Sequence, residues 1–238
     1  MSVMNPLERL RLSLRAHRIR RRGDPEFHWV REMLGPARRA IDCGANRGVY
    51  TYWLARYARA VEAFEPNPQL VAKLRAAGLG KVTVHEGALS DSAGEAVLHV
   101  PFHRRGGLND PGGCLDRPDD DTPMAQFTTP LKRLDDYGFT EVDFIKVDVE
   151  GHEEKVLAGA WHTISTQKPA LLLELEERHK PGCLTRVVTQ LADVGYRGLF
   201  LDANRWQAVN ELADWTSQRA STGRYINNFL FVADARLG

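Results

Sequence analysis

The sequence predicts an α/β fold built on a mostly parallel sheet. Three observations predict it: from residue 39 onward short apolar runs alternate with stretches of helical periodicity, a glycine-containing turn follows the first run, and an acidic residue ends the second. Strands joined through helices pair in parallel with right-handed crossovers. The length of 238 residues suits one such domain, and we find no internal repeat and no linker.

A basic amphipathic helix is predicted ahead of this pattern, over residues 4–22. It carries Arg9, Arg11, Arg15, Arg18, Arg20, Arg21 and Arg22. Such a segment can meet nucleic acid, anionic lipid or an acidic partner. We favour a solvated face, since arginine stems also cover apolar surface, with Leu7, Leu10, Leu14 and Ile19 on the buried side. A second short helix is expected over 28–34. We therefore divide the chain into a helical extension, 1–35, and a main domain, 36–238.

The main domain is predicted to contain strands and helices in alternation. Core strands are expected at 39–43, 60–64, 82–85, 143–147 and 170–174, and further strands at 96–100, 125–129, 199–201 and 226–232. Helices are expected at 49–57, 69–77, 131–137, 153–157 with an extension toward 161, and 184–194. The Gly-, Asp-, Pro- and Arg-rich residues 103–123 are predicted to form a long loop, and loops of that length are usually functional or mobile. We expect a lid over the acceptor, with Arg104, Arg105 and Arg117 suited to a carboxylate or phosphate.

Composition excludes several classes of protein. The three cysteines are widely spaced and form no Cys-x-x-Cys pair, which argues against a disulfide framework or a structural zinc site. A formal net charge of +1 indicates no particular partner. Neither a signal peptide nor a run of about 18 apolar residues is present. We expect a cytoplasmic protein without a membrane span or a nucleic-acid partner, and a homo-oligomer stays open.

The turn after the first strand is the first candidate ligand site. It runs Asp42-Cys43-Gly44-Ala45-Asn46-Arg47-Gly48. Glycine lets a ligand approach the backbone closely, and the next helix begins with unpaired N–H groups. The spacing is not Gly-x-Gly-x-x-Gly, so a pyrophosphate cofactor is less favoured than a compact one such as S-adenosylmethionine. A plain turn is the alternative.

Two further sites follow the second and third strands. Glu65 ends the second strand about 20 residues after the glycine turn, where an acidic residue accepts hydrogen bonds from ribose hydroxyls. Its alternative role is to cap the helix that begins at Pro68. The loop with Ala88, Ser90 and Asp91 follows the third strand and is predicted to flank adenine, because ligands lie beyond the carboxyl ends of such strands. A plain turn is equally typical of these residues.

Charged residues gather at the ends of two later strands. Lys146, Asp148 and Glu150 alternate with apolar residues, and such a cluster is costly to bury unless it is paired or used. It is therefore either a structural ion pair or part of the reaction site. Glu174 ends the next strand and His179 follows it. With Asp148 these two could form a hard-cation site, a base with its orienting partner, or a solvated loop.

Six segments together resemble the FkbM-type methyltransferases. They are IDCGANRG (41–48), FEPNP (64–68), ALSD (88–91), LDDY (134–137), DFIKVDVEGHE (143–153) and NFLFV (228–232). The resemblance spans roughly residues 38–232, and Lys-x-Asp-x-Glu-Gly is its most specific part. It implies a class I, Rossmann-like, seven-stranded methyltransferase fold and S-adenosylmethionine-dependent O-methylation of a hydroxyl on a small molecule or sugar. It would place Asp42, Gly44, Asn46 and Gly48 around the methionine end, and Glu65, followed by Pro66, on the ribose.

An acceptor hydroxyl must lose its proton as the new bond forms. The candidate helpers are Lys146, Asp148, Glu150, His152, Glu174 and His179; we place Asp148 first, then His152 or His179 as base. A divalent metal at Asp148 and Glu174 is a less favoured means of lowering the hydroxyl pKa. Two other functions stay open: an NAD-dependent oxidoreductase, which shares the glycine turn and Glu65, and a non-catalytic binding protein on the same fold.

Overall fold

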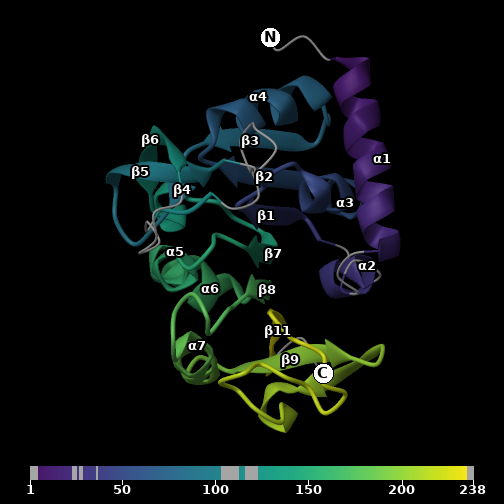
Figure 1. The fold of residues 1–238 in the computed structure, drawn as a ribbon, viewed down its shortest axis with the longest axis vertical. Helices are drawn as coiled ribbons and strands as arrows, with labels where there is room; N and C mark the ends of the chain where they lie inside the picture. Colours follow the sequence, from purple (N-terminus) through teal and green to yellow (C-terminus); the bar gives the residue numbers. More distant parts are fainter. Residues whose placement is uncertain are drawn as a thin grey trace.

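A central twisted sheet with helices on both faces forms the body of the protein (Figure 1). The computed structural model describes residues 5–22, 26, 29–35, 37–102, 113–115 and 123–234. The strands of the main sheet lie in the order β10-β9-β11-β8-β7-β1-β2-β3. Five neighbouring strands are parallel: β1 (Arg39–Cys43), β2 (Ala60–Glu65), β3 (Val82–Glu86), β7 (Val142–Val147) and β8 (Ala170–Glu174). The predicted α/β fold with a mostly parallel sheet is confirmed.

The main sheet has eight strands within the described residues, one more than the seven expected. Three of them pair antiparallel: β9 (Tyr196–Asp202), β10 (Arg205–Ala208) and β11 (Asn228–Ala233). The additional strand is β10, which a two-residue turn joins to β9. Both turn residues, Ala203 and Asn204, have positive φ (47° and 60°), the geometry that matches the twist of a hairpin.

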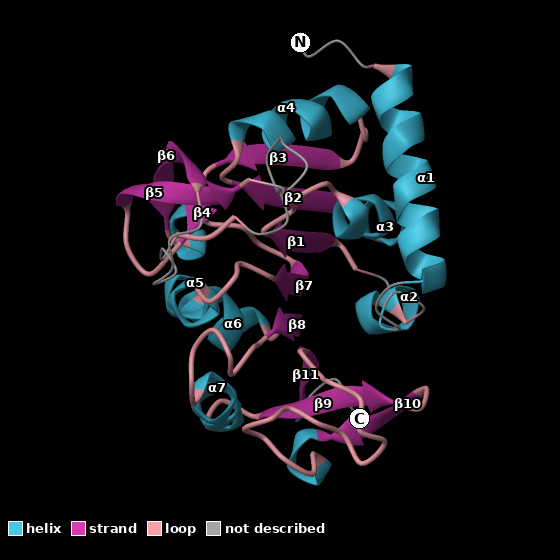
Figure 2. Cartoon of the chain, viewed as in Figure 1, coloured by secondary structure: helices cyan, strands magenta, loops and turns pink. Residues whose placement is uncertain are grey.

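The helices divide between the two faces of the sheet (Figure 2). One face carries α1 (Pro6–Arg22), α2 (Val30–Leu34), α3 (Val49–Tyr57) and α4 (Pro68–Ala77), and the other carries α5 (Glu153–Gly159), α6 (Trp161–Gln167) and α7 (Cys183–Ala192). Neighbouring residues of one strand serve opposite faces: Phe144 packs with the first group and Ile145 with the second. The central strands β1, β7 and β8 are buried along almost their whole length because both of their faces are covered.

A smaller sheet stands beside the carboxyl ends of the parallel strands. Its strands are β4 (Ala88–Leu89), β5 (Gly94–Pro101) and β6 (Met124–Lys132), in the order β4-β6-β5. The expected helix over 131–137 is wrong in its first part, because Leu131 and Lys132 belong to β6, where they pair with β4, and only Leu134–Tyr137 forms a short 3₁₀ helix. A second 3₁₀ turn lies at Val209–Glu211.

Helix α1 presents a different side to the domain from the one expected. Leu12 and Ala16, four residues apart, are buried against α3 and α4. Leu7, Leu10 and Leu14 are exposed by 63%, 56% and 63% of their surface, so their expected burial is wrong. The helix carries apolar residues on two faces, and the packing partner selects between them. Over the residues described, none of the helices has both the length and the apolar character needed to cross a membrane.

Candidate functional site

A pocket lies where β1, β2 and β7 end and β4 begins. It encloses about 650 Å³ of empty space, including the part open to solvent. The predicted site residues that line it are Gly44, Asn46, Glu65, Pro66, Ala88, Asp148, Glu150 and His152. Those that lie outside its lining are Asp42, Gly48, Ser90, Asp91, Lys146 and His179. The carboxyl ends of neighbouring parallel strands thus bring together residues that are about a hundred positions apart in the sequence.

Glu65 fixes the glycine turn to the end of β2. Its Oε2 accepts a hydrogen bond from the Asn46 amide at 2.6 Å, and its Oε1 accepts one from the Asn67 amide at 2.8 Å. The helix α4 is capped instead by Asn67, whose Oδ1 accepts from the Gln69 amide at 2.9 Å. A carboxylate oxygen can accept more than one hydrogen bond, so Glu65 keeps acceptor capacity on the pocket wall.

The side chain of Asn46 adds a hydrogen-bond acceptor to the pocket, and no described residue donates to that acceptor. It sits in the left-handed region with φ of 49°, and its Oδ1 is buried without a hydrogen-bond partner among the described residues. A buried acceptor without a donor costs free energy unless a ligand or water supplies one. This side chain is therefore a candidate contact for a donor group of a bound ligand.

The two glycines of the turn have different neighbours. A Cβ on Gly44 would lie 1.9 Å from the Asp148 carbonyl oxygen, so Gly44 allows the turn to pack directly against the end of β7. A Cβ on Gly48 would lie 2.4 Å from Leu74, so Gly48 allows α3 to begin close to α4. Gly44 lines the pocket and Gly48 does not.

Asp42 lies near the end of β1, next to the pocket residues Cys43 and Gly44, but does not line the pocket itself. It is fully buried, and its Oδ2 accepts a hydrogen bond from Thr51 Oγ1 at 2.5 Å. Burial raises the pKa of the carboxyl, and the opposite charge of Lys146 and the bond from Thr51 only partly offset this. Asp42 thus links β1 to α3, and its charge interacts with that of Lys146.

Lys146 and Asp148 form an ion pair at the end of β7. Nζ lies 2.7 Å from Asp148 Oδ2, and only 1% of the lysine side chain is exposed. Burial alone would lower the pKa of Lys146, but the carboxylates of Asp148, Asp42 and Glu174 outweigh it and raise the pKa. Nζ also lies 4.6 Å from the centre of the Tyr50 ring, a cation–π contact. The lysine therefore stays charged and holds Asp148 at the pocket edge.

Two glutamates beside this pair have raised pKa values. Burial, followed by the charges of Asp148, Glu176 and Glu153, raises the pKa of Glu150 to about 7. Burial, together with the charge of Asp148, raises the pKa of Glu174 to about 9, although Lys146 acts in the opposite direction. Like charges crowded in a partly buried site favour the protonated form. Glu150 lines the pocket, and with a pKa of about 7 its carboxyl group can gain or lose a proton near neutral pH.

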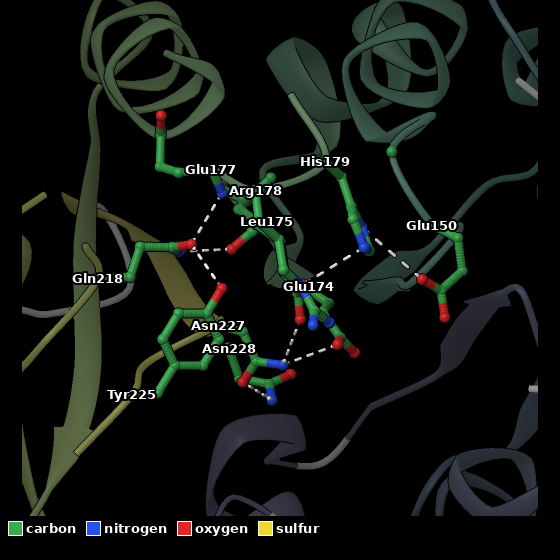
Figure 3. A network of polar contacts seen from close by, with 12 residues as sticks. Glu150, Glu174, Leu175, Glu177, Arg178, His179, Gln218, Tyr225, Asn227 and Asn228 are labelled. Atoms are coloured by element: carbon green, nitrogen blue, oxygen red, sulfur yellow. Dashed lines mark hydrogen bonds and ion pairs between the residues drawn. The ribbon is translucent and has the colours of Figure 1, made fainter. Parts of the chain in front are cut away.

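A polar network surrounds Glu174 (Figure 3). Asn227 Nδ2 donates to Glu174 Oε1 at 2.7 Å and to Glu176 Oε1 at 3.2 Å. His179 Nδ1 lies 3.7 Å from Glu150 Oε2, and its Nε2 lies 3.6 Å from Glu176 Oε2. His179 thus contacts two carboxylates behind the pocket rather than the pocket itself.

His152 is the histidine that lines the pocket. It precedes α5, is 4% exposed, and its Nε2 lies 2.9 Å from Ser90 Oγ. Ser90 Oγ in turn donates to Asp91 Oδ1 at 3.1 Å. Ser90 and Asp91 therefore act on the pocket through His152, as a chain of hydrogen bonds.

No cluster of three or more His, Cys, Asp or Glu side chains is placed to hold a metal ion in the described parts of the chain. Asp148, Glu174 and His179, the set considered from the sequence, all belong to those parts. Asp148 is instead paired with Lys146, and His179 with Glu150 and Glu176.

One wall of the pocket was not expected from the sequence. It consists of Leu98 and Val100 of β5 together with Gly113 and Leu115. The alternation of apolar Leu98 and Val100 with polar His99 is the sequence signal that could have indicated it. Of the proposed acceptor lid, Arg104, Arg105 and Arg117 lie outside the described residues.

Comparison with known proteins supplies an independent result. The family described as "Methyltransferase FkbM domain" matches residues 42–198, more than half of the chain. Among curated proteins, none matches. The solved structure of an FkbM methyltransferase from Methylobacillus flagellatus KT is similar over 97% of this chain, with 16% identity and a TM-score of 0.54. The chain covers 56% of that protein, about half its length.

Two other solved structures are similar at lower TM-scores. A candidate methyltransferase of Streptococcus mutans in complex with SAH has 12% identity and a TM-score of 0.47, over 87% of this chain and 94% of the other. A SAM-dependent methyltransferase of Aquifex aeolicus has 16% identity and a TM-score of 0.42, over 92% and 97%. At these identities the likeness concerns the fold, which is that of the class I methyltransferases.

Proposed function

Because the chain belongs to the FkbM methyltransferase family, we propose that it transfers the methyl group of S-adenosylmethionine to a hydroxyl on a small molecule or sugar. The observation that carries the proposal is the pocket, in which Glu65 and Asn46 face Asp148, Glu150 and His152. One side suits a nucleoside with an amino-acid tail, and the other suits a hydroxyl that must lose a proton.

The residues of the first side fit the methyl donor. Glu65 keeps acceptor capacity for the two ribose hydroxyls, and the buried Oδ1 of Asn46 accepts from the ammonium of the methionine end. Leu89 and Leu98 give the pocket an apolar surface for the adenine, beside Ala88. Asp42 and Gly48 support this side from outside the lining, by fixing α3.

The residues of the second side act on the acceptor. When bound, S-adenosylmethionine supplies an activated methyl group, so this side has to align the acceptor oxygen and receive its proton. Asp148, held by Lys146, accepts the hydrogen bond of the hydroxyl. His152 is the second candidate base because it lines the pocket, whereas His179 acts only through Glu150.

We also propose that residues 1–35 are an extension of the main domain, 36–238, rather than a separate unit. The packing of Leu12 and Ala16 of α1 in one apolar cluster with residues of α3 and of the sheet supports this division.

Calorimetry and turnover test the proposal in two steps. Titration with S-adenosylmethionine, S-adenosylhomocysteine and NAD⁺ should give heat with the first two only, and Glu65→Ala should weaken both interactions. A screen of hydroxylated sugars and acids with labelled methyl donor, read by mass spectrometry, should then find label on oxygen, and Asp148→Asn should abolish transfer while donor binding persists.

Other outcomes identify the competing functions. Heat with NAD⁺ alone would indicate an oxidoreductase, and donor binding without transfer to any acceptor would indicate a non-catalytic binding protein. Label on nitrogen would reject the O-methylation proposed here. Turnover that chelation abolishes and magnesium restores would replace the base at Asp148 with a metal.

A further inference from the structure

The outward face of α1 combines exposed leucines with arginines. Leu7, Leu10 and Leu14 lie one helical turn apart along the same side, and all three are more than half exposed. The opposite side of the helix packs on α3 and α4 through Leu12 and Ala16. More than half of the surface of these leucines is therefore left out of the packing of the domain, and an apolar stripe on a basic helix marks an interaction surface.

Positive charge surrounds this stripe. Arg18 and Arg21 continue it toward the end of the helix, both exposed and without an ion pair among the described residues. Arg11 lies on its flank, 71% exposed and paired with Glu8 at 2.6 Å, and also borders a second pocket. That pocket is lined by Glu8, Arg11, Leu12, Arg15, Arg47, Lys73, Leu74 and Ala77, four of which are basic and one acidic. The helix and its surroundings thus present a positive field next to exposed leucines.

We propose that this face of α1 binds an anionic membrane surface, with the helix lying parallel to the lipid plane. Leu7, Leu10 and Leu14 enter the layer between headgroups and acyl chains, while Arg18 and Arg21 contact the anionic headgroups. Helices that lie in the membrane interface combine an apolar stripe with basic residues in this way. The chemistry required of the partner is a negative surface with apolar material directly beneath it.

Charge and apolar area together favour a lipid surface over nucleic acid or a second copy of the chain as the partner of α1. A nucleic acid would pair with the arginines but would leave the leucines in water. A second copy of the chain would cover the leucines but would bring two sets of arginines together, and like charges at such a contact are unfavourable. A lipid layer satisfies both groups at once.

Helix α1 and the pocket of the main domain lie on different sides of the molecule. In Figure 1, α1 lies on one side of the view, beside α3 and α4, and β4 and β5, which border the pocket, lie on the other side. Membrane binding through α1 would therefore bring the protein to a surface without occluding the pocket. Turnover of a water-soluble acceptor should be the same with and without vesicles.

Vesicle sedimentation tests the proposal with the full-length protein. Vesicles of phosphatidylcholine mixed with phosphatidylglycerol should pellet the protein, and vesicles of phosphatidylcholine alone should not. The triple variant Leu7→Ser, Leu10→Ser, Leu14→Ser and the double variant Arg18→Glu, Arg21→Glu should each lower the partition coefficient roughly tenfold or more. Added salt should weaken binding of the wild-type protein.

Matched controls use residues far from α1. Val97→Ser removes an exposed apolar side chain on β5, and Arg205→Glu reverses an exposed charge on β10; neither should change vesicle binding. All of these side chains are exposed, so the melting temperature reports whether any variant is misfolded. Equal binding to both kinds of vesicle, no binding to either, or a leucine variant that instead converts a dimer to a monomer in sedimentation equilibrium would overturn the proposal.

Discussion

At the scale of single residues, Asn46 separates ligand binding from folding more cleanly than Glu65 does. Glu65 holds two backbone amides, so its removal disturbs the turn as well as the pocket. Asn46 contributes a buried oxygen without a partner among the described residues and adopts a left-handed backbone that glycine also tolerates. A change at Asn46 can therefore remove the ligand contact and leave the turn intact.

We predict that Asn46→Gly weakens the binding of S-adenosylmethionine and S-adenosylhomocysteine about tenfold or more, the loss of one hydrogen bond to a charged group. The melting temperature should change little. Asn204→Gly is the matched control, because Asn204 also has positive φ but lies in the β9–β10 hairpin. Calorimetry on both variants checks this. Equal affinities in the two variants would contradict a role for the Asn46 side chain.

The same residues show what the sequence could indicate. Strand ends of a parallel sheet share an edge, which predicts that Gly44, Asn46, Glu65 and Asp148 lie near one another, and all four line the pocket. That His179 contacts Glu150 behind the pocket was not predictable, because it depends on the path of the chain after Glu174. The assigned roles of these residues in donor binding and catalysis remain predictions.

At the scale of elements, the contact between the first turn and β7 depends on a single glycine. The Asp148 amide donates to the Cys43 carbonyl at 3.1 Å, which keeps the two strand ends together. Gly44 has φ of 78°, and there is no room for a Cβ beside the Asp148 carbonyl. This element pair positions one wall of the pocket relative to the other.

We predict that Gly44→Ala destabilises the protein by about 2–5 kcal/mol, from backbone strain and overlap with the Asp148 carbonyl. Gly80→Ala should change stability by less than about 1 kcal/mol, because Gly80 lacks a positive φ and no described atom lies within 4 Å of the place that the alanine methyl group would take. Urea unfolding of the two variants gives the comparison. A Gly44→Ala protein as stable as Gly80→Ala would refute the close packing.

Two substitutions in helix α1 test which of its faces packs on the domain. Leu12 is 5% exposed and Leu10 is 56% exposed on the same helix. We predict that Leu12→Ala costs about 2–5 kcal/mol of stability, whereas Leu10→Ala stays within about 0.5 kcal/mol. Denaturant titration measures both. If Leu10→Ala were the more destabilising change, α1 would have to pack through its other face.

Apolar periodicity predicts most helices and strands. It does not predict which face of a helix packs on the domain, and it misses short strands. The 49–57 helix coincides with α3 because its apolar spacing is regular. Strand β10 was not predictable in this way because its turn uses Ala203 and Asn204 in place of a glycine signal. Leu7, Leu10 and Leu14 of α1 are exposed although the pattern predicts them inward, because the helix is apolar on two faces and only the contact with α3 and α4 decides between them.

At the scale of the whole molecule, the charged cluster couples the stability of the fold to pH. Asp42, Lys146, Asp148, Glu150 and Glu174 lie together at the centre of the sheet. The location of such a cluster was predictable from the charged strand ends. The wall formed by β5 was not, because it requires the pairing of β5, which ends at Pro101, with β6, which begins only at Met124.

The raised carboxyl pKa values fix the sign of this coupling. Glu174 changes from its ordinary pKa of 4.5 to about 9 in the folded protein, and Glu150 changes from 4.5 to about 7. The folded state therefore binds these protons more tightly than the unfolded state does. Between about pH 4.5 and 9 the unfolded state holds fewer protons, so the contribution of these groups to the free energy of unfolding falls as pH rises.

We predict that Glu174→Gln removes much of this loss. Glutamine keeps the oxygen that accepts from Asn227 Nδ2 but cannot ionise, so the variant should match the wild type near pH 4.5 and exceed it increasingly up to about pH 9. Each kcal/mol gained would raise the melting temperature by roughly 2–4 °C for a protein of this size. Glu95→Gln, an exposed carboxylate on β5, serves as control and should run parallel to the wild type. If the difference between Glu174→Gln and wild type did not grow with pH, Glu174 would have to be ionised in the folded protein, and the charge of Lys146 would then outweigh its burial.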